Sequence, residues 1–432
     1  MKAKAPYNKS LTRRTFIKGV AGATLFSLIQ NPLLGRESEV RLGGQFSLTG
    51  PFASYGMWGH RATAAAVKKI NSRREGGING RKISYFVEDA KSNVQDGIRA
   101  MRKLIERERV DFIIGDVHSG INIACAPIAE KYNTIYFANG SAVSITADKG
   151  NRYIFRGMTN VRLTMKALEA YGIQSWGKRW YVIAADYAWG RSVARETADM
   201  VKKTRGTYVG EEFVPFPTKD LLPYIKKINP KNIDVIVVGF FGRDARNIMA
   251  QLHYLFGDEI TVIGNGSMLE GYALKDLGVA GKNLWYVTQY PHRSEYVEKR
   301  LQRYDKEYRT FLGVDPEGLG SDGSIAVLSF CYASWEYVHF IKYGIEKSGW
   351  NNRHDNPGII RSLEGMKVKG SIDFPQGDKE IRAEDHQVFH DHFIEQVENN
   401  KIVVKESVPK QALYYEPEVD YTKHDFTVNE WK

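Results

Sequence analysis

Short strand patterns alternate with helix patterns along almost the whole chain, and this alternation constrains the fold more than any single motif. The helix patterns carry apolar residues at a spacing of three and four. In the first series the strand patterns are residues 40–47, 83–87, 110–114 and 134–138, and the helix patterns are 58–73, 94–107 and 121–132. Helical connections between successive strands are typical of parallel sheets that are covered by helices on both faces.

The alternation restarts after residue 160 and predicts a second series. Its strand patterns are 180–185, 208–213, 233–238, 261–263 and 284–288, and its helix patterns are 163–171, 191–203, 221–228 and 245–256. Longer helix patterns follow at about 294–311 and 324–347, and the tail from Lys367 onward has the pattern of strands with turns. A chain of this length exceeds one compact core, so we expect two similar α/β lobes.

The N-terminus has the layout of a targeting peptide. Arg13 and Arg14 precede residues 19–34, an uncharged and largely apolar stretch, and the arginine pair resembles a twin-arginine export signal. We interpret residues 1–36 as a signal peptide that the twin-arginine translocase recognises, which predicts a periplasmic protein. The alternatives are an uncleaved membrane anchor or an amphipathic first helix, although a membrane span needs about 20 apolar residues.

The charge and the cysteines exclude several classes of protein. Seven basic residues precede the first acid, Glu37, and without them the net charge would fall from +11 to +4. So small a charge on a long chain gives no support for nucleic-acid binding. Cys125 and Cys331 each lie in an apolar helix pattern, so we expect two buried free thiols rather than a disulfide.

The loops that follow the strands are the candidate ligand site, because ligands of open α/β sheets bind beyond the carboxyl ends of the strands. These loops are residues 48–57, 115–121, 138–146, 186–191, 239–244, 264–270 and 289–293. In the first series they carry small polar residues, and Ser119 is expected to be the N-cap of a helix whose free amides bind an oxygen atom. In the second series they carry aromatic residues, which predicts an apolar cleft with a few polar groups.

Several of these segments together resemble the leucine/isoleucine/valine-binding protein family. The resemblance spans most of residues 40–400, and each motif is weak alone while their order and spacing are specific. The segments are 48–56, 70–71, 76–80 with Asp89, 112–119, 139–146, 155–156, 186–190, 233–251 and the residues around Gly264.

The resemblance implies the type I periplasmic binding protein fold, which has two Rossmann-like lobes with parallel-sheet cores joined by a three-segment hinge. It implies that lobe 1 combines residues 40–158 and 291–370, and that lobe 2 combines 159–290 and 371–415, with 416–432 as a C-terminal tail. It further implies a non-enzymatic protein without a cofactor or a metal, which hands a small molecule to the membrane permease of an ABC transporter for branched-chain amino acids or amides.

The resemblance also implies ligand-binding residues, position by position. Ser119 matches the serine that holds the ligand carboxylate, and the loop that follows the next strand matches a loop that supplies a carbonyl and a hydroxyl. Tyr55 and Trp189 match aromatic residues at the cleft, and Phe241 matches a tyrosine that faces the ligand. The full set of predicted ligand-binding residues is Tyr55, Val117, His118, Ser119, Asn139, Gly140, Ser141, Trp189, Phe241 and Gly266.

One position departs from the family pattern. Gly266 stands where amino-acid binders have an acidic residue that receives the ligand ammonium, and a buried ammonium without an acid costs several kcal/mol. Either Glu270 or Asp244 replaces that acid, or the ligand is not an α-amino acid. We favour the second interpretation, with an amide, a urea-like compound or a small carboxylate, including aromatic ones, as the ligand.

Other interpretations of the same residues carry less weight. The glycine pattern of 318–323 does not follow a strand, so it lacks the context of a dinucleotide site. His386, His390 and His392 would share one face of a strand, where a solvated surface is favoured over a zinc site. Ser119 could be only a helix cap, His118 a solvent-facing residue, and the predicted aromatic residues only core packing. Among functions, a ligand sensor of the same fold and an exported hydrolase are the alternatives.

Overall fold

The computed structural model describes residues 39–74, 76–218, 220–281 and 284–426. The predicted signal peptide lies outside these residues, and so do residues 427–432 of the predicted tail. The fold described below is that of the unit that begins at Ser38. None of the described helices is both long enough and apolar enough to cross a membrane.

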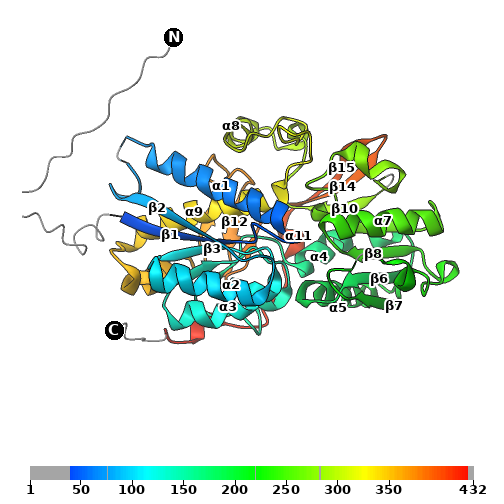
Figure 1. Ribbon diagram of the computed structural model, residues 1–432, viewed down its shortest axis with the longest axis horizontal. Coiled ribbons are helices and arrows are strands. Elements are labelled where there is room, and N and C mark those ends of the chain that lie inside the picture. The colour runs from blue at the N-terminus through cyan, green and yellow to red at the C-terminus, as the bar shows by residue number, and fades with distance from the viewer. Residues whose placement is uncertain (1–38, 75, 219, 282–283, 427–432) are drawn as a thin grey trace, which may run out of the picture. The chain divides into compact units, whose positions relative to one another are not determined.

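The first sheet has five parallel strands in the order β2-β1-β3-β4-β5 (Figure 1). Its strands are β1 (Glu39–Phe46), β2 (Lys82–Asp89), β3 (Phe112–Gly115), β4 (Ile135–Phe137) and β5 (Ile154–Phe155). The alternation of side chains along β3 shows how both faces are buried. Phe112 and Ile114 belong to the apolar cluster shared with α1 and α9, whereas Ile113 belongs to the cluster shared with α2 and α3.

The helices around this sheet come from two distant parts of the chain. Those from the N-terminal part are α1 (Ala53–Asn71), α2 (Val94–Arg102), which continues as a π-helix over Lys103–Arg107, and α3 (Ser119–Lys131). Those from the C-terminal part are α8 (Gln302–Leu312), α9 (Leu328–Ser348) and α10 (Asn356–Leu363). The long helix α9 packs along α1 and α10, so the chain returns to the first sheet after it has built the second.

The second sheet has the order β15-β14-β10-β9-β8-β6-β7, and its five strands from β6 to β10 are parallel. Its strands are β6 (Arg179–Ala185), β7 (Thr207–Val214), β8 (Val235–Gly239), β9 (Thr261–Asn265), β10 (Trp285–Thr288), β14 (His392–Glu398) and β15 (Lys401–Val408). The last two are antiparallel additions at one edge. Its helices are α4 (Val161–Tyr171), α5 (Ala188–Lys203), α6 (Leu222–Ile225), α7 (Gly242–Phe256) and α11 (Lys410–Leu413). The expectation of two parallel α/β sheets is therefore confirmed.

Three segments connect the two sheets in the described part of the chain, namely 156–160, 289–293 and 387–392. A small antiparallel sheet of β11 (Lys367–Val368), β12 (Lys379–Ile381) and β13 (Val388–Phe389) leads into the third segment. Side chains tie the segments together. The Thr159 hydroxyl lies 2.6 Å from His392 Nε2, and Gln376 Nε2 donates to the carbonyl oxygens of Gln289 and Asp391 at 3.1 and 2.9 Å. The lobe boundaries that the resemblance implies stay a prediction.

Helix α1 begins earlier than the sequence pattern predicts. It starts at Ala53 and not at Trp58, so Tyr55 lies in its first turn and not in a loop. A serine and a glycine in this turn are weak helix formers, and tertiary packing overrides that weakness. Gly56 is required there because a Cβ atom would lie only 2.0 Å from the carbonyl oxygen of Ser47. Glycine thus lets the first turn of α1 lie directly against the end of β1.

Other boundaries also differ from the prediction. Helix α5 begins at Ala188, three residues before the predicted Arg191, which places Trp189 on the helix. The helix predicted for 294–311 divides into a 3-10 turn and α8, and that predicted for 221–228 is the single turn α6. Helix α10 was not predicted; it begins at Asn356 with Pro357 in its first turn, where proline is tolerated.

Both cysteines are buried and free, as expected from their apolar surroundings. Cys125 lies on α3 and its sulfur accepts a hydrogen bond from Gln45 Nε2 at 3.3 Å. Cys331 lies on α9. Burial raises the pKa of the Cys125 thiol to about 12, so it stays protonated near neutral pH.

The guanidinium of Arg156, which is fully buried, should stabilise the first connecting segment. It donates to the carbonyl oxygen of Ala142 at 2.5 Å, to Thr146 Oγ1 at 2.6 Å and to Gln387 Oε1 at 2.7 Å. We expect Arg156→Met to lower the free energy of unfolding by about 3 kcal/mol, because buried acceptors lose their donors. Urea denaturation at equilibrium measures the loss.

The control for this prediction is Arg99→Met, which removes an exposed arginine of α2 and its ion pair with Asp96. We expect that change to cost about 0.5 kcal/mol or less, because exposed ion pairs contribute little. Equal losses in the two variants would contradict the stabilising role of Arg156.

Candidate ligand-binding site

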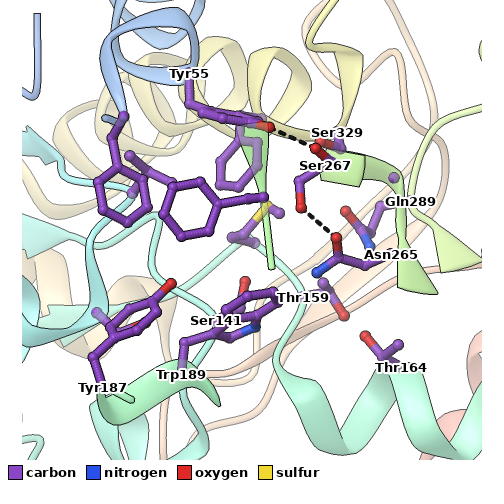
Figure 2. A pocket seen from close by; sticks show the side chains of 17 residues that line it. Tyr55, Ser141, Thr159, Thr164, Tyr187, Trp189, Asn265, Ser267, Gln289 and Ser329 are labelled. Carbon is purple, nitrogen blue, oxygen red and sulfur yellow. Dashed lines mark hydrogen bonds between the residues drawn. The ribbon is translucent and has the colours of Figure 1, made fainter. Parts of the chain in front are cut away.

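A cavity lies where the carboxyl ends of the parallel strands of both sheets meet (Figure 2). The space outside protein atoms at this place is about 510 Å³, a figure that includes space open to solvent. The residues that line it are Phe52, Tyr55, Val117, Ser119, Ser141, Met158, Thr159, Thr164, Tyr187, Trp189, Phe241, Asn265, Gly266, Ser267, Gln289, Ser329 and Phe330.

Seven of the ten predicted ligand-binding residues line this cavity. They are Tyr55, Val117, Ser119, Ser141, Trp189, Phe241 and Gly266. The other three, His118, Asn139 and Gly140, are buried but do not line it. The structure therefore brings the predicted loops together, and ligand binding by the seven residues stays a prediction.

His118, and not Ser119, is the N-cap of α3. Its Nδ1 accepts hydrogen bonds from the backbone N–H groups of Gly120 at 3.0 Å and Ile121 at 3.4 Å. Burial lowers the pKa of His118 to about 4, so the ring is neutral near pH 7 and Nδ1 keeps the lone pair that the cap needs. The prediction that Ser119 caps the helix is wrong, and so is the alternative of a solvent-facing His118.

The cap by His118 leaves Ser119 available for other contacts. Ser119 Oγ accepts a hydrogen bond from the backbone N–H of Ala142 at 3.2 Å, which joins the two predicted polar loops. A hydroxyl that accepts one bond can still donate its own hydrogen, and here it faces the cavity. Ser141 lies one residue before that N–H and lines the cavity beside it.

Asn139 and Gly140 support these loops from behind. Asn139 Nδ2 donates to Ser334 Oγ on α9 at 3.0 Å, and the N–H of Gly140 donates to Asn122 Oδ1 on α3 at 2.8 Å. A Cβ atom at Gly140 would lie 2.1 Å from the same Asn122 oxygen. These two residues thus hold the loop of Ser141 against α3 and α9.

The aromatic wall of the cavity comes from both halves of the molecule. The ring of Phe52 stacks on that of Phe241 with centroids 3.9 Å apart, and Trp189 lies edge-on to Phe241 at 6.1 Å. Tyr187 and Phe330 extend the wall. Phe52 and Tyr187 lie within loops that the sequence singled out, but nothing in the sequence distinguished them from their neighbours.

The hydroxyl of Tyr55 joins the two halves directly (Figure 2). It donates to the carbonyl oxygen of Ser267 at 2.5 Å and accepts from the N–H of Gly242 at 3.0 Å. Both partners follow strands of the second sheet, whereas Tyr55 lies on a helix of the first. The hydroxyl is thus occupied by protein groups.

None of the lining residues is an aspartate, glutamate, lysine, arginine or histidine. The two acids considered as replacements at Gly266 do not line the cavity. Asp244 lies on α7, where burial raises the pKa of its carboxyl. Glu270 is buried behind Ser329, and its Oε1 accepts the N–H of Ser329 at 2.8 Å.

Glu270 belongs to a buried charged group behind the cavity wall. His292 Nε2 lies 3.4 Å from Glu270 Oε1, and His292 Nδ1 lies 2.7 Å from Glu395 Oε2. Burial alone would lower the pKa of His292, but Glu395 and Glu270 together raise it to about 10. The imidazolium therefore offsets one of the two carboxylate charges, and neither carboxylate lines the cavity where a ligand ammonium could contact it.

The histidine run does not form a solvated strand face. His386, His390 and His392 are all fully buried, and His386 has a backbone φ of +57° that removes it from any strand. His390 and His392 stack with ring centroids 4.9 Å apart at the third connecting segment. Within the described ranges, no group of three or more His, Cys, Asp or Glu side chains is placed to hold a metal ion.

The chain matches the periplasmic binding protein family model over residues 39–401 and belongs to that family. The family consists of solute-binding proteins of transport systems and not of enzymes, which confirms the non-enzymatic prediction at the level of the family. A periplasmic location follows from the same membership.

The curated relatives carry the name that the resemblance implies. Leu/Ile/Val-binding protein homolog 7 of Brucella abortus is 26% identical over 247 residues, which cover 55% of this chain and 60% of that protein, so the match spans less than two thirds of that relative. Leu/Ile/Val-binding protein BraC3 of Rhizobium johnstonii is 24% identical over 366 residues, 82% of this chain and 91% of that protein.

Solved structures confirm the fold. A solute-binding protein of an ABC transporter from Rhodopseudomonas palustris BisB5 superposes with a TM-score of 0.72 at 19% identity, covering 86% of this chain and 98% of the other. The leucine-binding protein LivK of Thermotoga maritima gives a TM-score of 0.71 at 17% identity, over 86% and 99%. The type I periplasmic binding protein fold is therefore the fold of this chain.

The carboxyl of Asp116, which is fully buried, should make stability depend on pH. It accepts hydrogen bonds from the N–H of His118 at 2.7 Å and from Ser47 Oγ at 2.8 Å, and burial raises its pKa from 3.8 to about 7. Since the folded state holds this proton more tightly than the unfolded state, its contribution to stability is lost as the pH rises from about 4 through about 7.

The variant Asp116→Asn, which does not titrate, isolates this contribution. We expect the difference in free energy of unfolding, variant minus wild type, to become more positive as the pH rises from about 5 to about 8. Urea denaturation at several pH values measures this difference. A difference between the two proteins that stays constant with pH would contradict the expectation.

Proposed function

We propose that this protein is an exported receptor that captures a small polar solute in the cavity between its two lobes and delivers it to an ABC transporter permease. The observation that carries the proposal is the cavity itself, which combines an aromatic wall from both halves with hydroxyl and amide groups. Such a lining buries a ligand and orients it without altering it chemically. The names of the relatives agree with this role.

The ligand is a small carboxylate, an amide or a urea-like compound rather than an α-amino acid. Ser119 and Ser141 supply hydroxyl groups for an oxygen atom of the ligand, whereas an ammonium would find no carboxylate among the lining residues. Solved neighbours from Rhodopseudomonas palustris are described as complexes with 3,4-dihydroxybenzoic acid and with 4-hydroxybenzoate. Flat aromatic acids of this size suit a wall of aromatic rings.

Binding is proposed to proceed by closure of the lobes. The solute first meets Ser119 and Ser141 of lobe 1, and lobe 2 then covers it with Trp189 and Phe241. Contacts from both lobes give the ligand a higher affinity for the closed form, which shifts the equilibrium toward closure. The closed form then presents its surface to the permease.

Export is proposed to use the twin-arginine route. Arg13 and Arg14 precede the apolar stretch, and the proposal places the binding protein in the periplasm, where its permease partner opens.

A calorimetric screen of amino acids, amides, ureas and aromatic acids tests the proposed binding function. We expect at least one non-amino-acid solute to bind, and Ser119→Ala to weaken its binding about tenfold through the loss of one hydrogen bond. The control is Ser175→Ala, which changes an exposed serine that does not line the cavity. Unchanged affinity in Ser119→Ala would remove Ser119 from the site.

The hydroxyl of Tyr55 is expected to stabilise the closed form. Tyr55→Phe keeps the ring but leaves the N–H of Gly242 and the carbonyl of Ser267 without their partner, so the closed form loses stability and solute binding should weaken about tenfold. Small-angle scattering should show a larger open fraction at the same solute concentration. Tyr254→Phe, at a tyrosine that is 83% exposed, is the matched control. Wild-type affinity in Tyr55→Phe would contradict the role in closure.

A further inference from the structure

Two amide side chains line the cavity in the predicted loops 264–270 and 289–293, although the sequence did not distinguish them from their neighbours. Asn265 is the last residue of β9, and Gln289 directly follows the last residue of β10. These strands are parallel neighbours, and Asn265 is paired with Val287, two residues before Gln289. The two amides therefore project from adjacent strand ends, on the side of the cavity shown with Ser267 and Ser329 in Figure 2.

Gln289 is a buried polar group that lacks a partner. Its side chain is 2% exposed, and its Oε1 accepts no hydrogen bond from the described residues. Its backbone is fixed, because its carbonyl oxygen accepts a hydrogen bond from Gln376 Nε2 at 3.1 Å. A buried acceptor left without a donor costs about 1–3 kcal/mol, so a donor supplied by a ligand would be strongly favoured.

Asn265 is oriented by its neighbour. Its Oδ1 accepts a hydrogen bond from the hydroxyl of Ser267. Its amide nitrogen points away from Ser267 and into the cavity (Figure 2). Because every amide carries both a donor and an acceptor, the pair offers a ligand both kinds of hydrogen bond side by side.

The charged groups nearest to this corner, two carboxylates and one imidazolium, lie behind the cavity wall and keep one formal negative charge. Glu270 receives both the N–H and the hydroxyl of Ser329, and it lies beside His292, which also contacts Glu395. A ligand group that reached the corner would contact only neutral lining groups, those of Asn265, Ser267, Gln289 and Ser329. A full charge placed there would lose its hydration without gaining an opposite charge.

We propose that Asn265 and Gln289 form a specificity-determining subsite. The subsite selects an uncharged ligand group that has separate donor and acceptor atoms, such as a carboxamide, over charged groups of the same shape. This inference rests on the proposed binding function and narrows its ligand classes to the uncharged ones, the amides and urea-like compounds, in preference to the carboxylates. In the complex, a ligand N–H donates to Gln289 Oε1 and Asn265 Nδ2 donates to a ligand carbonyl oxygen.

Three planar probes of nearly equal shape test the subsite: benzamide is neutral, benzoate is an anion and benzamidine is a cation near pH 7. Calorimetry or competition with the wild-type protein should give benzamide an affinity at least about tenfold above that of either charged probe, because a charged group leaves the corner unsatisfied. Benzamide that binds no better than one of the charged probes, or not at all at millimolar concentration, overturns the inference.

Introducing a negative charge at Gln289 should change the relative affinities of the three probes, which a purely structural role of Gln289 would leave unchanged. Gln289→Glu keeps the shape but supplies a carboxylate, so the ratio of benzamidine to benzamide affinity should rise about tenfold while benzoate weakens further. Gln411→Glu makes the same change at an exposed position of α11 and should leave the ratios unchanged. An unchanged ratio in Gln289→Glu, with a melting temperature close to that of the wild type, also overturns the inference.

The two proposals fail separately. A protein that binds a solute from the screen but not benzamide keeps the proposed binding function and loses the amide subsite. A protein that binds no solute loses both the binding function and the subsite. If Gln289→Glu does not fold, the wild-type comparison of the three probes decides on the subsite.

Discussion

Parallel strands impose one constraint on which the whole molecule depends. Each strand must be followed by a crossover helix, so every strand of a sheet ends at the same edge and every following loop collects there. In this chain two such edges meet, and the three connecting segments hold them together. Arg156, in the first segment, donates hydrogen bonds both to the loop that follows β4 and to Gln387 in the third segment. The cavity lies where these two edges meet, and residues from the loops of both sheets line it.

Sequence patterns predicted the sheets well because burial on both faces leaves a strong signal. The apolar runs of β3 and β8 are each covered by helices on two sides, and such strands read as continuous apolar segments. The starts of α1 and α5 were predicted too late for the opposite reason. Their first turns contain residues with weak helix propensity, and both Tyr55 and Trp189 contact Phe241, which is distant from them in the sequence. Local sequence does not contain those contacts.

The candidate site was predictable to the extent that topology places it. Loops after strands had to lie at the cavity, and seven of the ten proposed residues do line it. The predicted residues that do not line the cavity, such as His118 and Gly140, are sequence neighbours of residues that do. The side chain of His118 and the N–H of Gly140 form hydrogen bonds within the protein that hold the loops in place. Gln289 and Asn265 were missed because an amide at a strand end has no distinctive pattern. Only the absence of a partner for Gln289 Oε1 in the folded chain identifies it.

The distribution of charge around the cavity explains how binding and release can coexist. The buried ionic group of Glu270, His292 and Glu395 keeps one formal negative charge, but it does not line the cavity, and it anchors the start of α9 and a connecting segment. Ligand affinity then has to come from burial against aromatic rings and from neutral hydrogen bonds, each of which contributes modestly. A charge pair buried with the ligand would instead hold it strongly, since separating such a pair leaves one charge unpaired. In the proposed closure through Tyr55, a cavity lined by neutral groups gains affinity for the solute as the lobes close. It loses most of that affinity as the lobes open, and a carrier that delivers its solute requires this property.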